Sequence, residues 1–419
     1  MSGILYETFT LDNGLKVIVH EDHSLAKAVV NVIYRVGAKD EDPNRTGFAH
    51  LFEHLMFGGS KHITDYDTPL QKVGGENNAF TTNDLTNYYL TLPSNQLETG
   101  FWLESDRMLE LDFSQRNLDV QKSVVIEEFK QRYLNKPYGD AHLILRSVHF
   151  KKHPYQWPTI GKEISHIEGA TLEEVKKFFY GFYAPNNATL VVAGDVTVPQ
   201  VRALAEKWFG PIPRRELLTR ELPREPKQSA PREKTVYRDV PFPAVYKMFH
   251  IPSKKDPAYF AADMMTDIMS GGKAGHLYQH VVKEKQVASS AAAFSWGAHH
   301  PGIISIDGTV ARGKTVEAYE TALKEVIESL YDLSESELQR VKNSIESQYV
   351  MERTTLLNKA MVLAICDTLG DPELANTSLD HYLAVTRDQV VEAAQTLLHP
   401  DNCSTLYYLP QNGKADAES

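Results

Sequence analysis

The stretch Gly47-Phe-Ala-His-Leu-Phe-Glu-His-Leu-Met-Phe-Gly58 decides how the rest of this sequence is interpreted. Its apolar residues recur at helical spacing, so we expect a helix over 47–57 that is closed by the pair Gly58-Gly59. His50 and His54 are four residues apart, and a helix therefore places both imidazoles on one face, one turn apart. Glu53 lies on the adjoining edge of that face.

A second Gly-Gly pair, at 271–272, follows a predicted helix over 258–269. It comes 213 residues after the pair at 58–59, close to half of the 419-residue chain. Between the two halves, 211–243 holds seven prolines among many charged residues, which is typical of a linker. After it the order of predicted strands and helices restarts, so the sequence predicts two related halves.

The predicted class is α+β, with two related halves that each hold an antiparallel or mixed sheet flanked by helices. Turn signals of hairpins and consecutive helical stretches favour this class over a regular β-α-β alternation. We expect an N-terminal half over 1–212, a linker over 213–243 and a C-terminal half over 244–419. The metal-binding pattern lies in the first half only.

Composition excludes several classes of protein. The chain is 42% apolar and 24% charged, which are ordinary values for a globular protein. A net charge of −11 argues against nucleic acid or an anionic membrane as the main partner. Cys366 and Cys403 are the only cysteines, which excludes a disulfide framework and a cysteine-based zinc site.

The location of the protein is expected from the same text. The N-terminus has no basic and apolar signal segment, and no run of 18 apolar residues occurs. We therefore expect a soluble protein without a membrane span, in the cytoplasm by default. It would be periplasmic or organellar if a targeting segment had been removed.

The order His-x-x-Glu-His at 50–54 has a chemical reading and a structural one. Zinc suits two imidazoles and one carboxylate, with a fourth position left open to water. Zinc lowers the pKa of that water, and Glu53 can accept its proton without being a ligand. The alternative is two histidines on a half-buried helix, satisfied by ordinary hydrogen bonds.

A third ligand is offered by the sequence Val-Val-Ile-Glu-Glu-Phe at 124–129, inside a predicted helix over 114–135. Two adjacent acids beside an apolar run are unusual, because charges avoid the core unless they have a partner. Helical geometry alone does not choose between Glu127 and Glu128, which lie about 100° apart around the helix. The alternative is a solvated acidic pair.

The 50–54 motif, followed some seventy residues later by Val-Val-Ile-Glu-Glu, resembles the pitrilysin, insulinase and mitochondrial-processing-peptidase family of inverted zincins. The resemblance covers essentially the whole chain and points to the short, two-half branch. It implies that His50, His54 and Glu128 bind one zinc ion and that Glu53 is the general base. The function it implies is a zinc metalloendopeptidase that hydrolyses unfolded or extended peptides.

The segment Gly-Gly-Glu-Asn-Asn-Ala-Phe-Thr at 74–81 resembles a family strand beside the zinc. In the family, the open edge of that strand pairs with the substrate backbone. The resemblance therefore implies that Asn78, Ala79 and Phe80 bind substrate by adding a strand to the sheet. The alternative is an ordinary strand start.

The sequence departs from the family in two places, one near the third ligand and one in the C-terminal half. Gln121 stands where the family usually has an acid seven residues before the third ligand. In the C-terminal half, Lys283 and Ser290 replace an Arg and a Tyr that stabilise the transition state in active members. Asp263, Thr266 and Asp267 occupy the positions that face the metal motif.

These departures imply a partner. We expect the catalytic subunit of a heterodimer, whose homologous partner supplies the Arg and the Tyr. A homodimeric processing peptidase is one alternative, and a non-catalytic scaffold subunit of the same family is another.

Overall fold

The computed structural model describes residues 3–411, which divide into two compact units. Unit 1 comprises the described parts of 1–130, 157–223 and 350–377, and unit 2 those of 131–156, 224–349 and 378–419. Each unit therefore includes a segment from the other half of the chain, 350–377 in unit 1 and 131–156 in unit 2. The predicted halves 1–212 and 244–419 describe which parts of the sequence repeat, whereas the two units describe which parts pack together. The predicted boundaries therefore stay a prediction.

Unit 1 is built on a mixed sheet of six strands, in the order β1-β2-β6-β3-β5-β4. β2 and β6 are parallel, and the other neighbours are antiparallel. The bounds are β1 (Glu7–Thr10), β2 (Lys16–Glu21), β3 (Lys27–Tyr34), β4 (Glu76–Thr81), β5 (Thr86–Pro93) and β6 (Ala188–Gly194).

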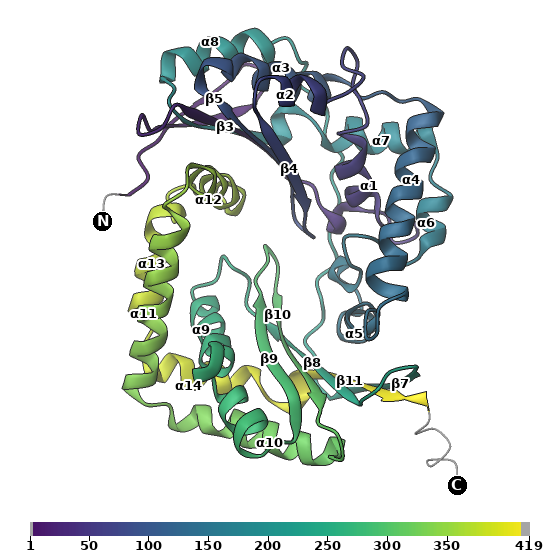
Figure 1. Ribbon diagram of the computed structural model, residues 1–419, viewed down its shortest axis with the longest axis vertical. Helices are drawn as coiled ribbons and strands as arrows, with labels where there is room; N and C mark the ends of the chain where they lie inside the picture. The colour runs from purple at the N-terminus through teal and green to yellow at the C-terminus, as the bar shows by residue number, and fades with distance from the viewer. Residues whose placement is uncertain (1–2, 412–419) are drawn as a thin grey trace. The chain divides into compact units, whose positions relative to one another are not determined.

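Helices cover both faces of this sheet. α3 and α8 contact β2, β3 and β5 on one face, and α12 contacts β3 and β6 on the other (Figure 1). The bounds are α1 (Phe48–Leu55), α2 (Asp67–Lys72), α3 (Leu97–Leu109), α4 (Gln115–Phe129), α6 (Ile164–Glu168), α7 (Leu172–Phe182), α8 (Val198–Trp208) and α12 (Leu356–Leu369).

Unit 2 repeats the arrangement with five strands, in the order β7-β11-β8-β10-β9. The bounds are β7 (Arg232–Arg238), β8 (Ala244–Ile251), β9 (Ala288–Trp296), β10 (Gly302–Val310) and β11 (Cys403–Pro410). β7 and β11 are parallel, as β2 and β6 are, and the remaining pairs are antiparallel. The same order and directions in both sheets confirm the α+β class with two related halves.

β7 lies within the stretch that the sequence predicts to be a linker. Its residues are mostly exposed and charged, and it pairs only with β11, at the edge of the sheet. An edge strand of this kind lacks the apolar alternation by which strands are recognised in a sequence.

The helices of unit 2 also cover both faces of its sheet. α5 contacts β7, β8 and β11, while α9 contacts β9 and α14 contacts both α9 and β8. The bounds are α5 (Ala141–His149), α9 (Ala258–Ser270), α10 (Val316–Ser329), α11 (Glu335–Glu352), α13 (Leu374–Ala384) and α14 (Arg387–Leu397). α11 and α13 cross the boundaries between the two units in the sequence.

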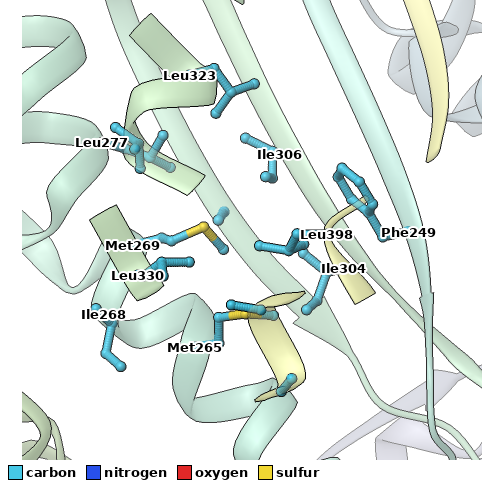
Figure 2. Close-up of a cluster of buried hydrophobic side chains, with 14 of the residues drawn as sticks. Phe249, Met265, Ile268, Met269, Leu277, Ile304, Ile306, Leu323, Leu330 and Leu398 are labelled. Atoms are coloured by element: carbon cyan, nitrogen blue, oxygen red, sulfur yellow. The ribbon is translucent and has the colours of Figure 1, made fainter. Parts of the chain in front are cut away.

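The main core of unit 2 lies between α9 and the sheet. Met265 and Met269 of α9 lie among the side chains of β10, including Ile304 and Ile306 (Figure 2). Both methionines are fully buried, and their spacing of four residues places them on one helical face. Apolar burial of this kind fixes α9 on the sheet.

α12 is held on the sheet of unit 1 by apolar and ionic contacts. Ala360 and Leu363 pack with sheet residues including Val29, Ile33 and Val191. The carboxylate of Asp367, only 3% exposed, accepts hydrogen bonds from Lys16 at 2.5 Å, from Thr189 at 2.6 Å and from Arg35. A helix from late in the chain therefore covers one face of a sheet that begins near the N-terminus.

None of the helices in the stretch 3–411 is long and apolar enough to cross a membrane.

Replacing Asp367 by Asn should destabilise unit 1 by about 2–3 kcal/mol, because Lys16 and Arg35 lose their buried counter-charge. Urea unfolding and hydrogen exchange in α12 measure the loss. Glu352→Gln removes the same charge from an exposed position and serves as the control. Equal stability of the two variants would contradict the role of Asp367.

Two stacked histidines join α5 to the sheet of unit 2. The rings of His149 and His250 lie 3.6 Å apart, and Nδ1 of His149 is 3.0 Å from Oγ of Ser404. Burial lowers the pKa of His250 from its ordinary 6.5 to about 4, and holds that of His149 well below its usual range. Both side chains are therefore neutral in the folded unit at neutral pH.

Acid should weaken this unit selectively. A lowered histidine pKa contributes stability that is complete above pH 6.5 and is lost progressively as the pH falls from 6.5 to about 4, because in this range the unfolded chain binds the proton and the folded chain does not. His250→Phe should therefore lose less stability than the wild type between pH 6.5 and pH 4, by about 2–3 kcal/mol. Urea midpoints across this range measure it, and parallel profiles would contradict it.

Candidate metal centre

Gly47 and the carboxylate of Glu41 determine where α1, the helix that carries the two histidines, begins. Gly47 precedes α1 with a φ of 93°, and a Cβ there would lie 2.6 Å from the backbone oxygen of Ile160. The buried carboxylate of Glu41 accepts hydrogen bonds from the backbone N–H groups of Gly47 at 2.9 Å and Ala49 at 2.8 Å. These bonds satisfy donors of the first helical turn, which have no partner within the helix.

Aromatic packing sets the rotation of α1. Phe52 is fully buried, and its ring stacks on those of Phe178 at 5.1 Å and Tyr183 at 5.0 Å. Because Phe52 lies two residues from both His50 and His54, burial of its ring turns the two imidazoles to another side of the helix. Their rings lie 4.9 Å apart, at 80° to each other.

α4 brings a carboxylate to the two imidazoles. Oε2 of Glu128 lies 3.5 Å from Nε2 of His50 and 3.3 Å from Nε2 of His54. Within residues 3–411, these three residues form the one group of three or more histidine, cysteine or acidic side chains close enough to share a metal ion.

The spacing fits zinc. Two ligands bound at about 2.0–2.1 Å with a tetrahedral angle are separated by about 3.4 Å. The two measured nitrogen–oxygen distances, 3.3 and 3.5 Å, lie on either side of this value. Two imidazoles and one carboxylate also match the three-ligand sets of catalytic zinc, which leave a fourth position for water or substrate.

The structure resolves the ambiguity between the adjacent acids. Glu127 forms an ion pair with Lys130 at 2.6 Å, and its side chain is 60% exposed. The Glu128 side chain is only 19% exposed and points to the histidines. The structure therefore places Glu128, and not Glu127, beside the two histidines in the candidate metal-binding group.

Glu53 lies beside this group and not within it. Its Oε2 accepts a hydrogen bond of 2.6 Å from the hydroxyl of Thr81, the last residue of β4. A carboxylate held in this way remains an acceptor next to the metal position. Neither Thr81 nor Glu41 has a predicted role from the sequence alone, although Thr81 ends the segment that resembles the family strand.

Asn78, Ala79 and Phe80 lie on β4, which is the edge strand of its sheet and pairs only with β5. The other edge of β4 therefore carries no strand from the described part of the chain. Oδ1 of Asn78 accepts a hydrogen bond from the backbone N–H of Ala79 at 2.8 Å. The three residues directly precede Thr81, which donates to Glu53, on the same strand.

The residues of unit 2 that depart from the family do not form a second metal-binding group in the described part of the chain. Asp263 of α9 accepts hydrogen bonds from Tyr382 at 2.5 Å and from Ser295. Lys283 is exposed and donates to Gln279 at 3.2 Å, and Ser290 is exposed on β9. Asp263 is therefore engaged in a hydrogen-bond network and not in a metal-binding group.

Two family models together match most of the chain. The model described as Insulinase (Peptidase family M16) matches residues 16–161, and the model described as Peptidase M16 inactive domain matches residues 169–345. The chain belongs to the M16 peptidase family. The first match includes His50, His54 and Glu128 and the adjacent Glu53, and the "inactive domain" match extends from residue 169 into the C-terminal part of the chain.

Individual M16 relatives agree with this assignment. The zinc protease PqqE of Helicobacter pylori is 29% identical over 341 residues, covering 80% of this chain and 76% of the relative. The uncharacterized zinc protease YmxG of Bacillus subtilis is 21% identical, covering 83% and 84%. The names of both relatives include zinc and proteolysis.

Solved structures show the same M16 fold. A protease from Helicobacter pylori superposes with a TM-score of 0.90 at 25% identity, covering 97% of this chain and 100% of that one. An M16 inactive-domain protein from Pseudomonas fluorescens superposes with a TM-score of 0.87 at 17% identity, covering 97% and 98%. The second likeness concerns the fold alone.

The adjacent acids provide a matched test of metal binding. Glu128→Gln should weaken Zn²⁺ binding by at least about 100-fold, because losing even an outer partner of a ligand costs about 10–100-fold. Glu127→Gln removes the same charge one residue away and should bind Zn²⁺ as the wild type does. Competition with a chromophoric chelator measures both affinities, and equal affinities would exclude Glu128 as a ligand.

Proposed function

We propose that this chain is a zinc-dependent endopeptidase that hydrolyses unfolded peptides. The observation that carries the proposal is the convergence of Nε2 of His50, Nε2 of His54 and Oε2 of Glu128, whose two nitrogen–oxygen distances of 3.5 and 3.3 Å match tetrahedral zinc. Glu53, which lies beside this group, supplies the acid–base function that hydrolysis requires.

The residues have separate roles in this reaction. His50, His54 and Glu128 would hold the ion, which would supply a Lewis acid for the peptide carbonyl and lower the pKa of water. Glu53 accepts a proton from the attacking water and then donates it to the leaving amine. Its bond to Thr81 keeps one carboxylate oxygen in a fixed position and so restricts the orientation of the carboxylate.

The substrate class follows from β4. An edge strand binds an extended peptide by main-chain hydrogen bonds, and a folded protein cannot present its backbone in this way. Asn78, Ala79 and Phe80 would line the incoming strand. The substrate must displace the hydrogen bond between the Asn78 side chain and the backbone N–H of Ala79 where it pairs at that position.

We further propose that the active enzyme is a heterodimer with a homologous subunit that supplies an Arg and a Tyr. The exposed Lys283 and Ser290 support this, because an ammonium lacks the planar fork of Arg and a Ser hydroxyl is shorter than that of Tyr. A homodimeric processing peptidase is the alternative assembly. The same two residues also favour a second candidate function, a non-catalytic scaffold subunit.

Glu53→Gln should abolish hydrolysis of a mixed pool of unstructured peptides and leave one zinc ion bound per chain, because it removes the proton acceptor and no ligand. Mass spectrometry of the peptides and metal analysis measure the two properties. Hydrolysis by Glu53→Gln at the wild-type rate would overturn the mechanism. Stoichiometric zinc without hydrolysis by the wild type would favour the heterodimer, and absence of zinc binding would favour the scaffold.

A further inference from the structure

The geometry points to Thr81 as a positioning residue that fixes the carboxylate of Glu53 and joins its orientation to the strand that receives the substrate. This inference rests on the proposed function, in which Glu53 is the general base. It adds to that function a residue that touches neither the metal position nor the reacting atoms.

The hydrogen bond from Thr81 to Glu53 restricts the orientation of the Glu53 carboxylate. The distance from Oγ1 of Thr81 to Oε2 of Glu53 is 2.6 Å, which is typical of a hydroxyl that donates to an ionised carboxylate. The hydroxyl has a single proton, and this bond uses it. A glutamate side chain has three rotatable bonds, so a fixed donor at one oxygen restricts where the other oxygen points.

The donor itself is held by a rigid hairpin. Thr82 and Leu85 close the turn after β4 with a backbone bond of 2.8 Å. The 3-10 turn Ala38–Asp40 is hydrogen-bonded to this hairpin. The N–H of Ala38 donates to the carbonyl of Thr82 at 3.1 Å, and the N–H of Lys39 donates to the carbonyl of Asn83 at 2.9 Å.

Gly37 permits this close approach. A Cβ at Gly37 would lie 2.5 Å from the carbonyl carbon of Asn83, so any larger residue would push the hairpin away. The Thr81 hydroxyl is therefore attached to backbone that is anchored from a second element of unit 1.

β4 links this anchor to the substrate. Asn78, Ala79 and Phe80 precede Thr81 on the same strand, and a bound peptide that pairs with the open edge restrains that strand further. Peptide binding to β4 and the orientation of the Glu53 carboxylate then both depend on the position of this one strand. Truncated peptides that do not pair along β4 should be cleaved with a lower kcat.

Three variants test the inference. Thr81→Val keeps the shape of the side chain and removes the donor, and it should lower kcat by about 10–100-fold with little change in KM. Thr81→Ser keeps the hydroxyl and should restore most of kcat. Thr91→Val makes the same change at the other end of the hairpin, where Thr91 pairs with Glu76, and should behave as the wild type.

Crystal structures of the variants provide a readout that does not need turnover. The Glu53 carboxylate should occupy one rotamer in the wild type and in Thr81→Ser, and more than one in Thr81→Val. A single unchanged rotamer in Thr81→Val overturns the inference even if the isolated chain is inactive. Where the wild type is active, an unchanged kcat in Thr81→Val overturns it and leaves the function of Glu53 intact, whereas Glu53-independent hydrolysis overturns the proposed function itself.

Discussion

Three atoms that bear lone pairs, Nε2 of His50, Nε2 of His54 and Oε2 of Glu128, lie within 4.8 Å of one another. Such atoms attract a cation, and the fold holds them in place from several directions. The Glu41 carboxylate and Gly47 fix where α1 begins, and the buried ring of Phe52 fixes its rotation. The rigid hairpin at Thr81 then adds a donor beside Glu53 without adding a ligand.

The two units differ in what the α-helix after the matching strands β3 and β8 carries, α1 in unit 1 and α9 in unit 2. The sheets repeat the same strand order and directions, so α9 occupies in unit 2 a position in the chain order that α1 occupies in unit 1. There the matching residue Asp263 accepts hydrogen bonds from Tyr382 and Ser295. In unit 1 this helix carries the two histidines of the candidate metal centre, whereas in unit 2 the equivalent helix is tied to its neighbours by hydrogen bonds.

Much of the fold and of the centre was predictable from the sequence, and the exceptions have physical reasons. The helix at 47–57 has a strong apolar period, and its histidine spacing determines a shared face whatever surrounds it. Spacing could not separate Glu127 from Glu128, because that choice depends on how α4 is rotated against α1. β7 was missed because an exposed edge strand has no apolar signal, and Thr81 because a hydroxyl has a role only through its neighbour in space.

The exchange of segments between units was also beyond the sequence, since helical periodicity does not say which sheet a helix covers. It has a consequence for synthesis on the ribosome. The apolar face formed by Ile18, Val29, Ile33 and Val191 is completed by α12, which ends at Leu369. Nascent chains shorter than this carry an uncovered sheet face, and unit 1 cannot reach its final state until most of the chain has been translated. The protein therefore depends on late folding, and until then its N-terminal sheet exposes an apolar face of the kind that makes folding intermediates prone to aggregate.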